Sequence, residues 1–198
     1  PDFISVTCSA GGSGNTDRTS TVASMVKNTY STEAVAHLTC INSDRAEIDA
    51  LTDTFIAEGI ENILALRGDI RDDKKTDFSH SSDLIPVLKE KGFCVGAACY
   101  PEGHIEAENM VEDIHNLKRK VDAGASHLIS QLFFDNDAFY GFLEKAKIAG
   151  INVPIEAGIM PVTNKNQIER MVSMCGASLP AKFVKVMQKY ENNIPFLI

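Results

Sequence analysis

Short apolar runs recur along the chain, and they are nearly continuous rather than alternating with polar residues. Such runs are typical of strands covered on both faces, as in a parallel sheet. They lie at residues 3–6, 34–38, 62–66, 94–98, 127–134 and 153–159. We therefore expect six strands in this order.

Helical patterns separate these runs. Within residues 44–58, apolar side chains recur at the spacing of one helix face, at Ile48, Leu51, Phe55 and Ile56. Within residues 106–123, the same spacing recurs at Val111, Ile114, Leu117 and Val121. A last helix is expected at about residues 164–175.

Four of the expected helices end at a glycine, which readily adopts the left-handed conformation that stops a helix. These glycines are Gly59, Gly92, Gly124 and Gly150. Successive glycines are 33, 32 and 26 residues apart, about the length of one strand–helix unit.

Strict alternation of strand and helix predicts a parallel sheet, either open and doubly wound or closed into a barrel. The glycine-rich loop at residues 10–14 lacks the Gly-x-Gly-x-x-Gly spacing of an open nucleotide-binding sheet, and no Gly-Lys-Ser/Thr follows it. The regular repeat favours a (β/α)8 TIM barrel. A complete barrel needs about 250 residues, so we expect this 198-residue chain to be a single domain holding about six of the eight units.

The composition narrows the class of protein. The charge is 19 − 27 = −8, and this acidic balance disfavours a general nucleic-acid or membrane-surface binder. No apolar run approaches the roughly 20 residues of a membrane span, and residues 1–4 show no signal-peptide pattern. We expect a cytoplasmic protein.

The cysteines are odd in number and lack two-residue spacing. We expect reduced, mostly buried thiols at Cys8, Cys40, Cys94, Cys99 and Cys175. His37 and Cys40 would point to opposite faces of a strand, so no metal site is expected.

Hydrogen-bonding and ionisable residues stand where each expected strand ends. They are Thr7, His37, Thr39, Arg67, Asp69, Tyr100, Glu102, His104, Gln131 and Glu156. In a barrel the chemistry sits at the carboxyl ends of the strands, so a shared cavity is the better interpretation. The alternative for each single residue is that it is solvated or caps the next helix.

Some of these residues at the strand ends have side chains suited to binding or catalysis. Arg67 could hold an anion or an electron-rich ring, or pair with Asp69, and Gly68 would let a ligand approach the backbone. Asp69 could act as an acid, a base or an electrostatic tuner. His37 is most simply a core histidine, whereas His104 follows a turn and precedes a helix, as ligand-facing residues often do.

The helix expected at residues 106–123 carries the only dense basic cluster, Lys118 to Lys120. Asp113, Asn116 and Lys120 share one face, with Arg119 beside it. This face could bind a phosphate or a ribose hydroxyl. The alternative is a solvated face stabilised by charge near the helix end.

A series of motifs in register resembles one family. The motifs are Leu66-Arg67-Gly68-Asp69, Ala98-Cys99-Tyr100-Pro101-Glu102-Gly103-His104, Asn116-Leu117-Lys118-Arg119-Lys120, Gln131-Leu132-Phe133-Phe134-Asp135 and Gly158-Ile159-Met160-Pro161-Val162. Together with Thr7 to Ala10 and His37 to Cys40, they resemble methylenetetrahydrofolate reductases of the bacterial catalytic-domain type over about residues 1–175.

The resemblance implies a (β/α)8 barrel that binds FAD, which takes a hydride from NAD(P)H and passes it to methylenetetrahydrofolate in ping-pong order. By the resemblance, the residues around FAD are Thr7, Ala10, His37, Arg67, Gly68, Asp69, Tyr100 and His104. Its ribityl, phosphate and adenosine parts would be held by Asp113, Asn116, Arg119 and Lys120. Asp69 would tune the flavin and lie near the folate, which Gln131 and Gln167 would contact.

The chain also departs from the family pattern. The family's Glu-Phe-Phe-Pro-Pro-like motif, whose Glu is the expected general acid, would lie upstream of Pro1 and has no counterpart here. A Phe expected against the substrate is replaced by Met171, and residues 194–198 match no part of the family. We therefore expect this chain alone to be catalytically poor. Missing strands would also expose sheet edges, which favours a homo-oligomer.

Two other classes remain open. A flavin-free barrel lyase or isomerase acting on a phosphorylated metabolite would favour a strand lysine or a late glycine-rich phosphate loop, and neither is visible. A non-enzymatic fragment could keep only a ligand-binding surface or a subunit contact. A visible flavin spectrum would separate these classes.

Overall fold

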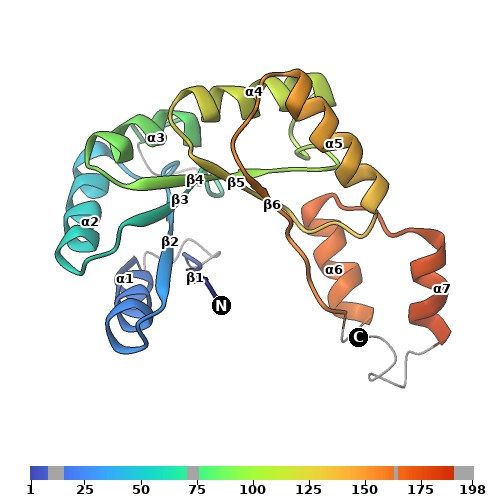
Figure 1. Ribbon diagram of the computed structural model, residues 1–198, viewed down its shortest axis with the longest axis horizontal. Coiled ribbons are helices and arrows are strands. Elements are labelled where there is room, and N and C mark those ends of the chain that lie inside the picture. The colour runs from blue at the N-terminus through green and yellow to red at the C-terminus, as the bar shows by residue number, and fades with distance from the viewer. Residues whose placement is uncertain (9–15, 71–75, 163–164, 190–198) are drawn as a thin grey trace. The chain divides into compact units, whose positions relative to one another are not determined.

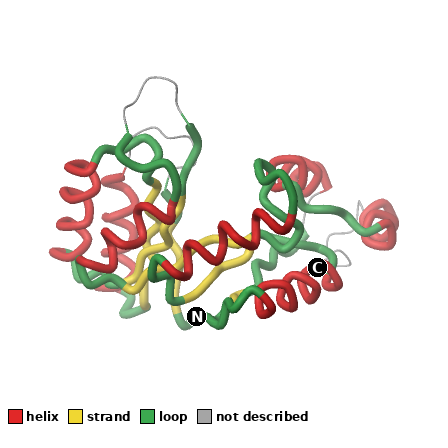
Figure 2. Tube along the Cα trace, turned by 90° about the horizontal axis from the view of Figure 1, so that it is seen from above, coloured by secondary structure: helices red, strands yellow, loops and turns green. Residues whose placement is uncertain are grey.

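Strands and helices alternate along the chain in the computed structural model, which describes residues 1–8, 16–70, 76–162 and 165–189 (Figures 1 and 2). The elements are β1 (Phe3–Val6), α1 (Thr16–Ser24), a π-helix η1 (Met25–Thr29), β2 (Glu33–Thr39), α2 (Arg45–Ala57), β3 (Asn62–Leu66), α3 (Ser81–Glu90), β4 (Cys94–Cys99), α4 (Met110–Asp122), β5 (His127–Ser130), α5 (Asn136–Ile148), β6 (Ile155–Glu156), α6 (Lys165–Cys175) and α7 (Ala181–Lys189).

The six strands form one sheet in the order β1-β2-β3-β4-β5-β6. The pairs β1–β2, β2–β3, β3–β4 and β5–β6 are parallel. Sequential order with a helix between parallel neighbours is the arrangement of a (β/α)8 barrel. The predicted fold, about six units of a TIM barrel, is confirmed.

β5 and β6 are shorter than the sequence pattern suggested. Beyond Ser130, the side chain of Gln131 accepts a hydrogen bond from the Leu132 backbone N–H at 2.9 Å. The Gly158 N–H donates to the hydroxyl of Ser130 at 2.8 Å. These bonds replace ladder bonds, so the apolar runs at 127–134 and 153–159 continue past the strands as loops.

The chain divides into two compact units, which are described separately. Unit 1 comprises Pro1–Ala98 and Arg119–His127, and unit 2 comprises Cys99–Lys118 and Leu128–Ile198. The expectation of a single domain stays a prediction.

The core of unit 1 follows from the register of its strands. Ala36, Ile63 and Val95 are adjacent across β2, β3 and β4, and each is fully buried. His37, Leu64 and Gly96 form the next row and point to the opposite face, because neighbouring residues in a strand alternate. Figure 1 shows α2 and α3 outside the strands of this unit.

Helix α2 begins where the sequence predicts, but the face it buries differs from the expected apolar face. Asp44 forms a capping box with Glu47. Ile48, Thr52 and Phe55 are buried, whereas Ile56 is 50% exposed. The prediction for Ile56 is therefore wrong. The stripe runs through positions i, i+4 and i+7, and Thr52 joins it because its hydroxyl donates to the Ile48 carbonyl at 2.7 Å.

Helix α4 starts at Met110 rather than at residue 106. Asn109 precedes it, and the Asn109 side-chain oxygen accepts a hydrogen bond from the Glu112 N–H at 3.0 Å. Such a bond satisfies a backbone donor in the first turn. Ile114 and Leu117 are buried as predicted, but Val111 is 65% exposed, so its assignment to the buried face is wrong.

The four predicted helix-ending glycines are confirmed. Gly59, Gly92, Gly124 and Gly150 all have positive φ, between 74° and 119°. Each follows a helix and precedes the next strand, so these residues set the repeat of the fold.

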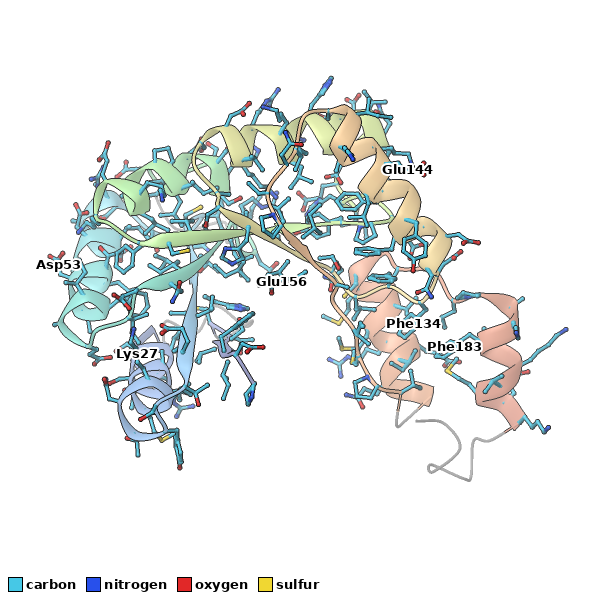
Figure 3. All side chains as sticks on the ribbon, viewed as in Figure 1. Lys27, Asp53, Phe134, Glu144, Glu156 and Phe183 are labelled. Carbon is cyan, nitrogen blue, oxygen red and sulfur yellow. The ribbon has the colours of Figure 1, made fainter. Side chains whose placement is uncertain are left out.

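The amino ends of β2 and β3 carry an ion-pair network centred on Lys27 (Figure 3). The Lys27 ammonium lies 3.1 Å from Glu33 and 2.7 Å from Glu61, and Asn62 donates to Glu33 at 2.8 Å. The bond to Glu61 is the main cause that raises the pKa of Lys27. This network ties the strand starts together, at the end of the strands opposite the candidate site.

A separate apolar cluster lies in unit 2. Val162, Ile168 and Met187 are buried, and Phe134 and Phe183 pack against them. The rings of Phe134 and Phe183 stack at 5.0 Å between centroids, and Figure 3 shows them facing each other. Helix α7, which the sequence pattern did not predict, is held to α6 and to the segment after β5 by this cluster.

The cysteines are free thiols, but the expectation that most are buried is wrong. Cys40 and Cys99 are buried, Cys8 and Cys175 are half-buried, and Cys94 is exposed. Cys94 opens β4, where its Sγ lies 3.3 Å from the Ser126 hydroxyl. None of the helices in the described part of the chain is long and apolar enough to span a membrane.

Candidate functional site

In unit 1, the predicted residues lie at the carboxyl ends of the first three strands. Thr7 follows β1, His37 lies near the end of β2, and Arg67, Gly68 and Asp69 follow β3. Asp69 and Thr7 are exposed, while Arg67 and His37 are half-buried. Ala10 lies outside the described residues.

The turn at Arg67–Asp69 is fixed by the segment after β2. The Arg67 carbonyl accepts hydrogen bonds from the N–H groups of Cys40 at 3.1 Å and Ile41 at 2.9 Å. The Asn42 side-chain amide donates to the Asp69 carbonyl at 2.6 Å. Sequence reasoning missed Asn42, since a single Asn after a strand carries no specific signal.

Gly68 is required by the geometry of this turn. Its φ is +85°, and a Cβ at this position would lie 2.9 Å from the Cβ of Thr39. A side chain would therefore be strained by the backbone and blocked by Thr39. Glycine at this position therefore allows the turn that carries Arg67 and Asp69 to pack closely against Thr39.

His37 lies on the face of the sheet that also carries Ser5. The Ser5 hydroxyl is 2.6 Å from Nε2 of His37. Burial lowers the pKa of His37 from its ordinary value of 6.5, so the ring is neutral at physiological pH. Register explains the pair, since Ser5 lies opposite Val35, two residues before His37.

Cys40 is unsuited to nucleophilic chemistry. Burial raises the pKa of its thiol to about 12, and its Sγ donates to the His80 carbonyl at 3.5 Å. Across the described residues, His, Cys, Asp and Glu side chains form no group of three or more that could hold a metal ion.

In unit 2, Tyr100 and His104 form one side of the loop after β4. Their rings meet edge to face at 4.6 Å between centroids. The backbone N–H of Glu106 donates to Nδ1 of His104 at 3.1 Å. Because Nδ1 accepts this bond, the ring proton resides on Nε2, which is then a hydrogen-bond donor.

The side-chain amide of Gln131 is also held in one orientation by a backbone hydrogen bond. Its backbone N–H donates to the Cys99 carbonyl at 2.8 Å, which fixes the end of β5 beside the end of β4. Its Oε1 accepts from the Leu132 N–H at 2.9 Å. The side-chain amide nitrogen is thereby identified, and within the described part of the chain it donates no hydrogen bond.

Ser130 and Gly158 bring the ends of β5 and β6 together. The Ser130 hydroxyl donates to the Gln131 carbonyl at 3.0 Å and accepts from the Gly158 N–H at 2.8 Å. A Cβ on Gly158 would collide with the Ser130 carbonyl oxygen. Gly158 stands in a predicted motif, but its close approach to Ser130 has no signal in the sequence.

Basic and polar side chains of helix α4 differ in how far they take part in contacts within the protein. The Lys120 ammonium donates a hydrogen bond to the Ala98 carbonyl at 2.9 Å. Arg119 is exposed, Asn116 is half-buried, and Asp113 is 7% exposed. Burial of Asp113 does not fit a fully solvated face, and the binding roles of Asp113, Asn116, Arg119 and Lys120 stay predictions.

The remaining predicted residue of unit 2 lies on α6. Gln167 is exposed, and Met171, one turn further along the helix, is half-buried. Unit 2 thus holds Tyr100, His104 and Gln131 near strand ends, with Gln167 on a following helix. The convergence of the unit 1 and unit 2 residues on one hollow stays a prediction.

The donor chemistry of the strand ends suits a ligand rich in acceptor atoms. Arg67, Nε2 of His104 and the Gln131 amide are donors, and all three follow strands of a parallel sheet. The fold defines a barrel-type α/β protein, the class in which ligands bind at the carboxyl ends of the strands.

Comparison with known sequences identifies the family. The family described as methylenetetrahydrofolate reductase matches residues 1–195. The 5,10-methylenetetrahydrofolate reductase of Escherichia coli is 40% identical over 194 residues, and that of Pectobacterium carotovorum is 36% identical. The chain belongs to the methylenetetrahydrofolate reductase family. Both alignments cover 98% of this chain and 65% of the relative, so the chain spans about two thirds of these proteins.

More distant comparisons agree on the family and the fold. Methylenetetrahydrofolate reductase (NADH) 1 of Arabidopsis thaliana is 36% identical, over 98% of this chain and 36% of its own. A solved structure from Clostridium thermocellum, described as binding two copies of 5-methyl-5,6,7,8-tetrahydrofolic acid, has a TM-score of 0.59 at 15% identity. It covers 87% of this chain and 62% of its own. That structure supports the fold alone.

Proposed function

We propose that the protein reduces 5,10-methylenetetrahydrofolate to 5-methyltetrahydrofolate, with FAD as cofactor and NAD(P)H as hydride donor, in ping-pong order. The observation that carries the proposal is the family match over residues 1–195. The placement of the motif residues Arg67, Asp69, Tyr100 and His104 directly after β3 and β4 supports it.

The chemistry of these residues fits FAD. An isoalloxazine ring presents carbonyl oxygens and ring nitrogens as acceptors, and its diphosphate is anionic. His104 carries an Nε2–H, Arg67 carries a guanidinium, and Gly68 adds no side chain to the turn between β3 and the ligand side of the sheet. Arg119 and Lys120 lie in the last turn of α4, where they would neutralise the phosphates. Thr7, Ala10, His37, Asp113 and Asn116 complete the proposed cofactor set.

Bound FAD would supply hydride relay between the two substrates. The residues of this chain would bind and orient. Gln131, whose Oε1 is held by Leu132, would donate its amide protons to acceptors on the pterin, and Gln167 would contact the same substrate. The exposed carboxylate of Asp69 would favour positive charge on the folate during ring opening, since opposite charges attract across a short distance.

The test is spectroscopic and uses the protein expressed from its complete gene, because this chain spans only 65% of the length of its bacterial relatives. A bound flavin band should be bleached by NADH or NADPH without oxygen and restored by methylenetetrahydrofolate. Parallel double-reciprocal plots would support ping-pong order. A colourless protein with no affinity for FAD overturns the proposal, and a flavin that NAD(P)H does not bleach leaves only a binding role.

Two further proposals concern the cellular location and the oligomeric state of the protein. We propose a cytoplasmic homo-oligomer. Among the described strands, β1 and β6 each have one neighbour in the sheet, and an unpaired strand edge favours association. Light scattering of the purified protein tests the oligomer directly, and a monomeric mass overturns it.

A further inference from the structure

The loop after β4 is bonded to a segment far away in the sequence. Both carboxylate oxygens of Glu102 accept a hydrogen bond from the backbone N–H of Ser178, at 3.0 and 3.1 Å. Glu102 is half-buried, and Ser178 lies in the connection between α6 and α7. Hydrogen bonds to an ionised acceptor are stronger than neutral ones, so this contact ties the two segments firmly.

The same two segments also come near each other at Gly176. Gly176 ends α6 with a φ of +70°, and a Cβ at this position would lie 3.9 Å from the Cβ of Ile105. Gly176 and Ile105 therefore lie near each other, and the bonds from Ser178 to Glu102 are the contact that holds the α6–α7 connection to the loop.

The two linked segments carry different parts of the proposed site. The loop includes Tyr100 and His104, whose rings are in contact. The connection follows α6, which carries Gln167 and packs through Ile168 into the apolar cluster of unit 2. That cluster fixes α6 to α7 and to Phe134. Glu102 adds the link between this helix pair and the loop.

We propose that Glu102 is a positioning residue for the folate-binding side of the site. Its carboxylate holds the start of the α6–α7 connection, so that Gln167 on α6 keeps its place relative to the loop of Tyr100 and His104. This inference rests on the proposed function. It separates two roles within one loop, because Tyr100 and His104 face the cofactor while Glu102 serves the substrate helix.

The kinetic test compares Glu102→Ala, Glu102→Gln and a matched control, Glu108→Ala, in the protein expressed from its complete gene. Glu108 is an exposed carboxylate six residues further along the chain. In Glu102→Ala we expect the KM for methylenetetrahydrofolate to rise about fivefold to tenfold, the scale of one lost hydrogen bond, with kcat and flavin reduction by NAD(P)H within twofold. Glu102→Gln keeps one carbonyl acceptor and should recover part of the effect.

Two kinetic results would overturn the positioning role. One is an unchanged KM in Glu102→Ala. The other is a fall in both half-reactions in proportion to lost FAD, which would indicate general damage to the fold. Glu108→Ala should match the unmodified protein in every measurement.

Amide hydrogen exchange at Ser178 provides a readout without catalysis. Loss of the acceptor should speed exchange of the Ser178 N–H about tenfold in Glu102→Ala and leave it unchanged in Glu108→Ala. Unchanged exchange in Glu102→Ala overturns the link itself, whatever the activity. Failure of the unmodified protein to bind FAD overturns the proposed function instead, so the two failures are distinguishable.

Discussion

The backbone N–H of Glu106 donates a hydrogen bond to Nδ1 of His104. A loop only a few residues long thus fixes the tautomer of its own histidine. Because the donor at Nε2 is set by the backbone rather than by a ligand, it is present before any cofactor arrives. Such preorganisation lowers the cost of binding.

His104→Ala should weaken FAD binding by about fivefold to tenfold, the effect of one hydrogen bond. His115→Ala is the matched control, since His115 is exposed on α4. Nitrogen-15 chemical shifts of the unliganded protein at neutral pH should show His104 protonated at Nε2 and not at Nδ1. A proton on Nδ1 would contradict the assignment.

Gly68 allows a second prediction, on the turn that presents Arg67 and Asp69. Gly68→Ala adds backbone strain and places a Cβ 2.9 Å from that of Thr39. Gly92→Ala is the control, because its φ is similar at +91° and nothing lies within 4 Å of the added atom. We expect Gly92→Ala to cost about 1 kcal/mol of unfolding free energy and Gly68→Ala about 1–3 kcal/mol more. Equal losses in urea titrations would show that Thr39 can yield.

His37 predicts a pH dependence of stability. Burial lowers its pKa in the folded protein below the ordinary 6.5, so the unfolded chain binds the proton more readily. Stability from this group is therefore complete above about pH 6.5 and is lost as the pH falls towards the lowered folded pKa.

Urea titrations between pH 5 and 8 test this dependence. His37→Gln should lose less stability on acidification than the unmodified protein, and His115→Gln should behave like the unmodified protein. An identical pH slope in all three proteins would show that His37 does not titrate differently on folding.

The sequence predicted the elements that depend on local signals. The apolar runs marked all six strands, and the four glycines with positive φ marked the helix ends. It overestimated β5 and β6, because apolar residues also line loops whose backbone bonds go to side chains such as Ser130. Ile56 and Val111 were wrongly expected to be buried. Each lies at the border of the apolar face of its helix, where the sequence does not show whether a side chain is covered by a packing partner.

The residues of the candidate site also divide into those with a local signal in the sequence and those that depend on tertiary contacts. Residues with a hydrogen-bonding or ionisable side chain at a strand end were visible in the sequence, and the structure puts Arg67, Asp69, His104 and Gln131 after their strands. Asn42 and Ser5 were not visible, since each acts only through a neighbour brought close by the sheet register. The role of Glu102 depends on a partner 76 residues away, which no local pattern reveals.

The junction of β5 and β6 supports a final prediction. Gly158 donates its N–H to the Ser130 hydroxyl, and a side chain at 158 would collide with the Ser130 carbonyl oxygen. Backbone cannot rotate aside as a flexible side chain does, so we expect Gly158→Ala to cost about 2–3 kcal/mol. Ser130→Ala removes the acceptor of a partly buried N–H and should cost about 1–2 kcal/mol.

Gly141 is the matched control for this junction, because it lies inside α5 and an added Cβ would meet only the Lys145 ammonium at 3.8 Å. Gly141→Ala should therefore stabilise the protein by about 0.5–1 kcal/mol, the helix preference of alanine over glycine. Thermal and urea unfolding of the three variants would check the order of the effects. A tolerated Gly158→Ala would show that the ends of β5 and β6 can separate.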